Sequence, residues 1–581
     1  MLRPFRYPAT HYLAHNHVRA STPFWYTQHD MCFLRRWRLD HRIDWTIAPF
    51  FALFFALHTA WGAPPLRQPH LLVVIIAEQF RADYLEIYRS GFSDSGFNRL
   101  SREGAAFQRL RFDHLATLTA PDAAILATGA YPELNGIVGD RWYDRERRKV
   151  VSAEEAWAEP YSVAPPDAGP SPGNLIGSSF ADELRLASDG QSRVVVVSGR
   201  AAPAVMLAGR RPNGCYWQKA DGQFETSPYY AERLPAWAQE FNQNHPIMRF
   251  DGKPWVALDG AAQSAPLRVI QLRGPNGRDN FLALYHASPF ATEDTFEFAK
   301  RAIEAEKLGN SQYTDLLVVH LSSPGRLALE TGAYSPLMRD MVLRLDRSIA
   351  DFLGWLEKGI GLNRVSLVFT ATHGIPPLPD AAGKQGLTAG RVAGDDVVRA
   401  INEAMEKEFD APVFVEKYIY PFVYLNAQAH DLSDANFRRL TEVAGQGALQ
   451  VKGVATYFTP AAVRIPSTIR EKLRRSWHPP RSGDLLLVYE PYFVEQFGNS
   501  RGTSPGSLYR YDTDVPLILF GTGFKPGRFE SEVDATAVAP TISALLGIPA
   551  PTSATGKVLS EALLPQQPPA SAVGPPPPQT Q

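Results

Sequence analysis

Unbroken apolar runs alternate with amphipathic stretches along most of the chain. Each run is short, rich in Val, Ile and Leu, and bounded by polar residues, a pattern typical of strands buried within a parallel sheet. Five segments have this pattern: 71–77, 193–198, 315–321, 365–371 and 515–521. Between them, residues 337–356 place apolar side chains at helical spacing, and residues 536–546 predict another helix. Strands that alternate with helices predict an α/β fold, a doubly wound and mostly parallel sheet with helices on both faces.

Two ranges break this alternation, and we expect them to be insertions into one domain that spans residues 66–563. Residues 210–299 are rich in Trp, Tyr, Pro, Asn and Gly and predict a cap over the sheet edge. Residues 392–485 predict a second, mixed insertion that contains a strand at 418–425. The Pro-rich tail at 564–581 lacks the apolar residues that a core requires, so we expect it to be disordered.

Residues 1–65 form a leader in front of this domain. The apolar run at 47–57 follows a basic stretch and precedes small residues up to Ala63, which is the order of a secretory signal. We expect Met31 to be the true start, because the residues before it resemble no signal sequence. The run is short for a membrane span. The sequence therefore predicts export to the periplasm or the extracellular space, with an uncleaved N-terminal anchor as the alternative.

Composition and charge narrow the range of partners. The 581 residues carry a formal net charge of −1, which gives no argument for nucleic acid or a membrane surface as a partner, so we expect no nucleic-acid partner. The two cysteines are Cys32 and Cys215, and cleavage of the leader would leave only the second. A disulfide framework and a cysteine-built metal site are therefore excluded from the mature chain.

Thr119 stands at the start of a predicted helix over residues 120–128, before a loop punctuated by Gly and Pro. A hydroxyl at this place faces free backbone N–H groups and the positive end of the helix dipole, which suits an anion-binding site. The alternative is that Thr119 only caps the helix, with Asp122 completing a pattern like a capping box. The local pattern alone favours the cap.

Several separate motifs together resemble one family. They are V-V-I-I-A-E-Q-F-R-A-D-Y-L, T-L-T-A, G-I-V-G-D-R-W-Y-D, R-L-D-R-S-I-A-D-F, T-A-T-H-G and A-P-T-I-S-A-L-L-G-I. In these elements, from about residue 71 to about residue 564, the chain resembles the alkaline phosphatase superfamily. The resemblance is closest to the phosphate-irrepressible, threonine-nucleophile (PafA-type) alkaline phosphatases.

This resemblance implies a phosphomonoesterase with two zinc ions. One zinc would activate the threonine nucleophile, and the other would activate water and stabilise the leaving-group oxygen. The positions of the first zinc site correspond here to Glu78, Thr119 and the pair Thr372 and His373. Glu is an acceptable replacement for the family's Asp, but the neutral Thr372 hydroxyl is a poor zinc ligand. The resemblance thus implies at most one residual zinc site, at Glu78, Thr119 and His373, or none.

The other positions of the family's site have changed more. The second zinc's ligands correspond to Gly325, Leu329 and Pro505, whose side chains cannot bind a cation. Among the phosphate-binding groups, Arg200 could still hold a phosphate. Asp140 stands where the family has Asn, so it would repel a phosphate or pair with Arg200.

Two hypotheses follow. In the first, the chain is an exported, degenerate family member, a pseudoenzyme that binds a phosphorylated small molecule or another ligand in the old cleft. In the second, it still hydrolyses phosphate monoesters or diesters with Thr119 as nucleophile, using one residual metal or His373 as base. The alternative for His373 is an inherited, hydrogen-bonded residue, and Glu78 could simply cap the strand end or pair with Arg200 or Arg81. The changed metal-ligand positions favour the first hypothesis.

Overall fold

The computed structural model describes residues 68–155, 169–259, 265–273, 276–409, 414–460, 466–498 and 500–565. The predicted leader at 1–65 and almost all of the predicted tail at 564–581 lie outside these residues. Export, anchoring and the disorder of the tail therefore stay predictions.

A nine-stranded mixed sheet forms the centre of the described chain. Its strand order is β19-β2-β18-β11-β1-β10-β5-β6-β7. The strands are β1 (Leu71–Ala77), β2 (Ala105–Arg111), β5 (Val194–Ser198), β6 (Gly214–Gln218), β7 (Phe224–Glu225), β10 (Asp315–Leu321), β11 (Val365–Ala371), β18 (Asp514–Gly521) and β19 (Gly527–Asp534). The strands from β11 to β6 run parallel, with Leu71 in register with Asp315 on one side and Val365 on the other. β18 runs antiparallel to both of its neighbours.

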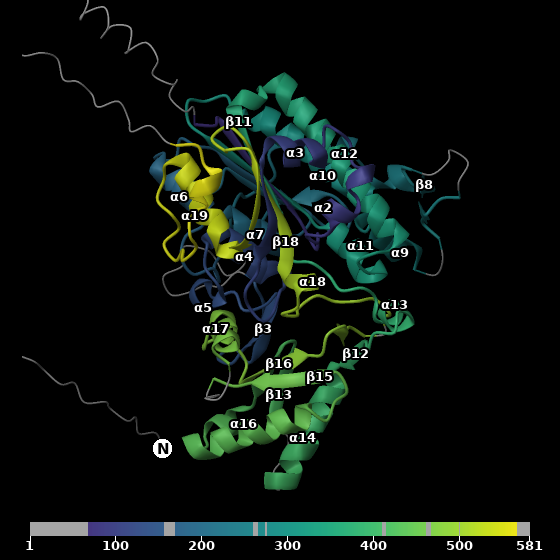
Figure 1. Cartoon of the computed structure of the whole chain (residues 1–581), viewed down its shortest axis with the longest axis vertical. Coiled ribbons are helices and arrows are strands. Elements are labelled where there is room, and N and C mark those ends of the chain that lie inside the picture. The colour runs from purple at the N-terminus through teal and green to yellow at the C-terminus, as the bar shows by residue number, and fades with distance from the viewer. Residues whose placement is uncertain are drawn as a thin grey trace, which may run out of the picture. The chain divides into compact units, whose positions relative to one another are not determined.

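Helices cover both faces of this sheet, as Figure 1 shows. One face carries α4 (Thr119–Thr128), α6 (Phe180–Ala187), α7 (Ala201–Ala208) and α19 (Val538–Leu546). The other carries α2 (Tyr84–Ile87), α3 (Phe97–Glu103), α10 (Pro289–Glu306), α11 (Ser323–Thr331) and α12 (Pro336–Gly359). Strands of this kind bury both faces, which is why their sequences are continuously apolar. The predicted α/β fold is confirmed.

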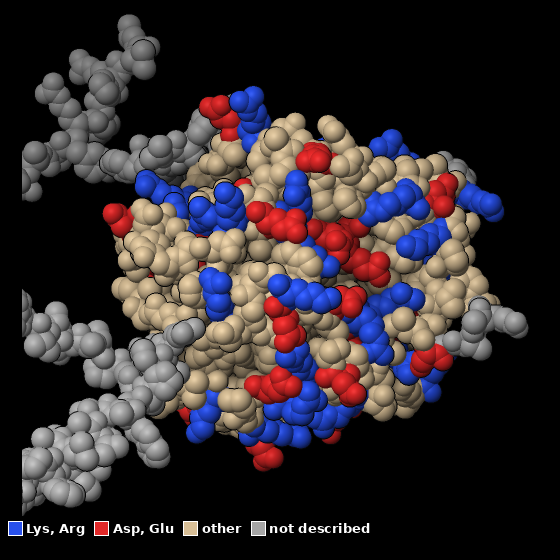
Figure 2. Space-filling view, turned by 90° about the horizontal axis from the view of Figure 1, so that it is seen from above, with Lys and Arg blue, Asp and Glu red and all other residues tan. Residues whose placement is uncertain are grey.

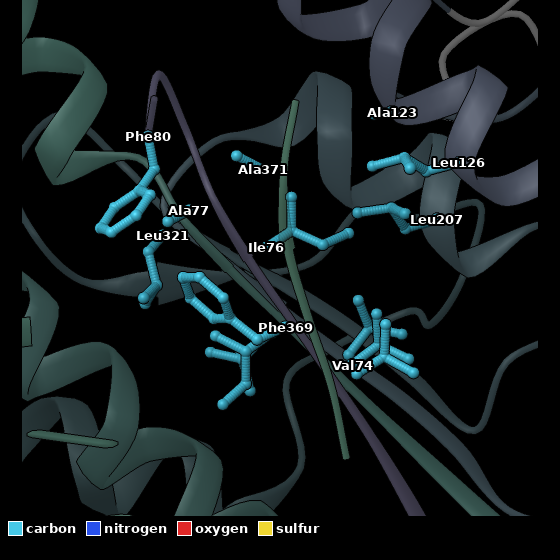
Figure 3. Close-up of a cluster of buried hydrophobic side chains, with 14 of the residues drawn as sticks. Val74, Ile76, Ala77, Phe80, Ala123, Leu126, Leu207, Leu321, Phe369 and Ala371 are labelled. Carbon is cyan, nitrogen blue, oxygen red and sulfur yellow. The ribbon is translucent and has the colours of Figure 1, made fainter. Parts of the chain in front are cut away.

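Alternation along β1 divides the core into two layers (Figure 3). Val74 and Ile76 point toward α4 and α7, where Leu126 and Leu207 meet them. Phe80 and Phe369 lie on the opposite side of the strands, with ring centroids 5.4 Å apart. Every residue of α4 is buried, so its small side chains are explained by close packing on the sheet and on α7. This packing fixes the start of α4 beside the carboxyl end of β1.

The two ranges predicted as insertions differ in how they fold. Part of the range predicted as a cap, β6 and β7, extends the main sheet instead of covering it. The rest of that range holds α8 (Ala236–Asn244), the paired strands β8 (Lys253–Trp255) and β9 (Arg268–Ile270), and α9 (Gly277–His286).

The second insertion builds its own four-stranded sheet, in the order β13-β14-β16-β15, with its own hydrophobic core. Its strands are β13 (Val415–Ile419), β14 (Phe422–Leu425), β15 (Val454–Phe458) and β16 (Leu485–Tyr489), and its helices are α14 (Gly394–Phe409), α15 (Ala427–His430), α16 (Asp434–Ala448) and α17 (Ser467–Ser476). The single strand predicted at 418–425 was wrong. The chain turns at Tyr420-Pro421 to form the antiparallel pair β13 and β14, because proline cannot donate to a strand ladder.

Short elements complete the described structure. They are α5 (Pro132–Asn135), β3 (Arg141–Asp144), β4 (Lys149–Ser152), α13 (Pro379–Lys384), β12 (Gly390–Ala393), β17 (Phe493–Gln496) and α18 (Arg510–Thr513). None of the helices in the described ranges combines the length and apolar character that a membrane crossing requires. Basic and acidic side chains are interspersed on the face of the molecule seen in Figure 2. The basic side chains form no continuous patch on that face.

Candidate functional site

Four sequence-predicted site residues gather at the carboxyl edge of the sheet, where parallel α/β proteins place their sites. Glu78 follows β1, Arg200 follows β5 and His373 follows β11, while Thr119 begins α4. The Thr119 hydroxyl donates a hydrogen bond of 2.8 Å to Glu78 Oε1. Arg200 Nη1 donates to the same oxygen over 2.7 Å. The structure therefore joins Thr119, Glu78 and Arg200 in one buried network.

Glu78 is ionised within this network. Burial by itself would raise the pKa of its carboxyl, but the Arg200 guanidinium, as the largest opposing cause, and the hydrogen bond from Thr119 help to lower that pKa to about 2. A carboxylate with such a low pKa is a weak base, so it holds the Thr119 hydroxyl without removing its proton. Of the two alternatives for Glu78, the pair with Arg200 is the one formed. Arg81 pairs with Asp83 instead.

Asp140 occupies the start of α4. Its Oδ1 accepts a hydrogen bond of 2.7 Å from the backbone N–H of Ala120, and its Oδ2 lies 3.9 Å from Arg200 Nη2. The alternative role of Thr119 as the helix cap was wrong, because its hydroxyl turns to Glu78. Asp122 does not complete a capping box either, since its carboxyl lies 2.8 Å from His114 Nε2. An internal carboxylate thus takes the position where an external anion would meet the helix dipole.

His373 is buried, and its tautomer follows from its contacts. Nδ1 lies 2.8 Å from the carbonyl oxygen of Gly374, which can only accept, so Nδ1 carries the proton. Nε2 is then an unprotonated acceptor, and in the described part of the chain it has no hydrogen-bond partner. Burial lowers the pKa of His373 below its usual value, so the ring is neutral. No hydrogen bond between described residues joins it to Thr119.

The donors required for two zinc ions can be tested against the packing around Gly325. A Cβ on Gly325 would stand 2.7 Å from Glu78 Cγ, so Glu78 fills the space into which a side chain at residue 325 would extend. Leu329 and Pro505 offer no donor atom. Within the described ranges, no group of three or more His, Cys, Asp or Glu side chains is arranged to hold a metal ion. These residues do not fit a two-zinc centre, and a single site at Glu78, Thr119 and His373 stays a prediction.

The network borders a cleft of about 1030 Å³. Leu118, Asp140, Arg200 and Pro505 line one part of it, and residues of the second insertion line another. Asp140 and Arg200, which the resemblance assigns to phosphate binding, and Pro505, which it assigns to the second zinc site, therefore line one cavity.

Comparison with known proteins assigns the family. A family model described as "Type I phosphodiesterase / nucleotide pyrophosphatase" matches residues 72–502. The chain belongs to this family. The alkaline phosphatase PhoV of Synechococcus elongatus is 29% identical over 86% of this chain and 94% of its own length. A protein of Myroides odoratus named "Calcium-transporting ATPase" is 28% identical over 89% of this chain and 99% of its own.

The solved structures agree with this assignment. The crystal structure of the alkaline phosphatase PafA superposes with a TM-score of 0.75 and 26% identity, covering 86% of this chain and all of that chain. The predicted membership of the alkaline phosphatase superfamily and the fold that it implied are both confirmed.

Sequence motifs gave no signal for Glu495, a buried carboxylate beside the cleft, and did not show which group binds Asp512. Asp512 accepts from the Ser507 hydroxyl at 2.6 Å, and burial raises the pKa of Asp512 to about 7. Glu495 accepts from the hydroxyls of Tyr418 and Tyr489. Glu495, Tyr418 and Tyr489 come from separate segments of the chain, so no local sequence pattern could reveal their contacts.

Proposed function

We propose that this family member does not hydrolyse phosphomonoesters by the two-zinc route and acts as a pseudoenzyme that binds a ligand in its cleft. The packing of Glu78 against Gly325 carries the proposal. The carboxylate that would serve the first zinc is shared between Arg200 and Thr119, and its Cγ stands 2.7 Å from the place of a Cβ on Gly325, a position that the resemblance assigns to the second zinc site.

The nucleophile position supports the same proposal. A threonine hydroxyl reacts slowly unless a metal or a base removes its proton. Here the hydroxyl donates to a carboxylate of very low pKa, and the start of the helix already holds Asp140. A phosphoryl group at this position would meet two buried or half-buried negative charges. Loss of the metal that stabilises the leaving group removes several kcal/mol of transition-state stabilisation.

Turnover of p-nitrophenyl phosphate and bis(p-nitrophenyl) phosphate tests this proposal. The purified protein, supplied with zinc, should show no hydrolysis above the background, and Thr119→Ala should leave that background unchanged. Hydrolysis that Thr119→Ala abolishes would contradict the proposal. Thr522→Ala is a matched control, because this half-buried residue donates to the carbonyl of Asn363 at the other end of β11.

The second candidate is a slow phosphate hydrolase, favoured by the Nε2 of His373, which has no hydrogen-bond partner among the described residues. A neutral imidazole with an unshared electron pair has the chemistry of a general base or of a ligand to one residual metal. His373→Gln distinguishes the two candidates. Any Thr119-dependent turnover would fall by about 100-fold in this variant if the imidazole acts as the base.

We also propose export of the protein, supported by the basic, apolar and small-residue order of the leader. Fractionation of cells that express the full chain with a C-terminal tag tests this. The tagged protein should appear, shortened, in the periplasm or the medium. Recovery of the full-length chain in the membrane fraction would favour the uncleaved anchor.

A further inference from the structure

The cleft carries more negative than positive groups. Its lining contains five carboxylate side chains and three cationic ones. One of the cations, Arg200, is already paired with Glu78, which lies behind the cleft wall. A family that acts on phosphate esters requires the opposite balance, because a bound phosphate must be met by donors and positive charge.

Glu495 is the most deeply held of these carboxylates. It lies on β17 and is only 9% exposed, yet it lines the cleft. Its Oε2 accepts hydrogen bonds from the hydroxyls of Tyr489 and Tyr418. Its Oε1 makes no hydrogen bond with any described residue. This oxygen lies 3.3 Å from the place of a Cβ on Gly394, which lines the same cleft. Glu495 is therefore a carboxylate that lines the cleft and has one oxygen without a hydrogen bond to any described residue.

Aromatic side chains line the same cleft as Glu495. Tyr418 and Tyr420 line the cleft, and the Phe497 side chain, 60% exposed, stands among the same lining residues. The phenol of Tyr420 donates to the carbonyl of Gly506 over 3.0 Å, and that of Tyr418 donates to Glu495. The hydroxyls are thus engaged within the protein, and the rings remain as the contact surface. Aromatic rings beside a carboxylate attract organic cations both by charge and by the ring quadrupole.

We infer that the cleft wall formed by Glu495, Tyr418 and Tyr420 binds an organic ammonium group. The inference rests on the proposed function, since it names the class of ligand for a cleft that does not hydrolyse phosphate esters. An ammonium placed there would donate to Glu495 Oε1, contact the two rings and offset the excess of carboxylates. A phosphate would gain none of these contacts.

The protonation of Glu495 adds a signature to this binding. Burial raises the pKa of its carboxyl to about 7, against the opposing hydrogen bonds of Tyr489 and Tyr418. The titratable groups that face it are the phenols of Tyr418, Tyr420 and Tyr489, whose own pKa values burial raises well above the usual range, so they stay neutral. A bound cation favours the ionised carboxylate. Binding should therefore strengthen between pH 6 and pH 8.

The test uses two probes that differ in one group, the 2-phenylethylammonium ion and the neutral 2-phenylethanol, with calorimetric titration of the purified full chain at pH 8. The cation should bind at least tenfold more tightly than the alcohol. Glu495→Gln should weaken binding of the cation at least tenfold and leave the alcohol unaffected. Glu530→Gln, an identical change at an exposed position of β19, should alter neither affinity.

A second pair of variants keeps the test decisive if Glu495→Gln fails to fold. Tyr420→Phe retains the ring and should retain the cation, whereas Tyr420→Leu should lose most of the affinity. Equal affinity for the two probes, or equal affinity of the Phe and Leu variants, would overturn the inference. Tight binding of inorganic phosphate in competition with the cation would overturn it as well. Phosphate-ester turnover that depends on Thr119 would contradict the proposed function instead, so the two failures are distinguishable.

Discussion

Removal of Arg200 tests the network around Glu78 most sharply. Glu78 is 1% exposed, and Arg200 is its close counter-charge at 2.7 Å. In Arg200→Met the carboxylate keeps its burial and loses this partner, so its pKa should rise above 4.5. A pKa of about 2 in place of the ordinary 4.5 corresponds to about 3 kcal/mol. Breaking a buried ion pair from one side costs about 3–5 kcal/mol. The Arg200 side chain is 31% exposed, so we expect the lower end, about 3 kcal/mol.

Urea denaturation at pH 7 measures this loss, and a double-mutant cycle with Glu78→Gln assigns it. Arg200→Met should cost much less in the Glu78→Gln background, since no buried charge is then left unpaired. The lowered pKa of Glu78 stabilises the wild type above pH 4.5, and this stabilisation disappears as the pH falls through 2. The gap between wild type and Arg200→Met should therefore narrow at low pH, where the variant's Glu78 takes up a proton. A loss below about 0.5 kcal/mol at pH 7, or an equal loss in both backgrounds, would show that Arg200 does not stabilise the charge of Glu78.

Three further predictions concern the same site and its cleft. Gly325→Ala should destabilise the protein by about 1–3 kcal/mol in thermal unfolding, because the new Cβ would stand 2.7 Å from Glu78 Cγ. The control Gly354→Ala, in an open part of α12, should stabilise the protein by about 0.5–1 kcal/mol. Equal effects of the two substitutions would contradict the clash with Glu78. Glu495→Gln should gain stability relative to the wild type, by about 2–3 kcal/mol, as the pH of urea denaturation rises from 5 to 9. The reason is that the pKa of Glu495 is raised to about 7, so ionisation of this buried carboxyl destabilises the wild type. A stability difference that does not change with pH would contradict the burial of the charge. Asp140→Asn should tighten inorganic phosphate binding at least fivefold in calorimetry, because it removes a charge 3.9 Å from Arg200 and keeps an oxygen for the Ala120 N–H; unchanged affinity would show that Asp140 does not exclude anions.

The hydrophobic pattern of single segments predicted the main strands of the sheet but not the direction in which each strand runs. The five apolar runs became β1, β5, β10, β11 and β18 with bounds shifted by at most one residue, because strands buried on both faces must be apolar throughout. The antiparallel direction of β18 could not be predicted, since a strand's own residues look the same in either direction. The segment 418–425 was misjudged because its apolar residues continue across the turn at Pro421.

The candidate site shows the same division. The family resemblance located Glu78, Thr119, Arg200 and His373, and the structure brings the first three into contact. The resemblance could not say how Glu78 is used, because its partner follows a different strand, 122 residues away. Asp140 as the acceptor at the start of α4 was likewise hidden, since it stands 20 residues from the N–H that it accepts. Contacts between residues far apart in the sequence depend on the tertiary fold, and the spacing of motifs along the sequence does not reveal them.

The number of zinc ions bound per chain tests whether this protein forms a two-zinc centre. The full chain, dialysed against zinc and then freed of excess metal, would be measured by atomic emission. We expect one zinc or none, because Glu78 fills the space beside Gly325 and neither Leu329 nor Pro505 supplies a ligand. Two tightly bound zinc ions per chain, with one lost in a Glu78→Ala variant, would contradict it.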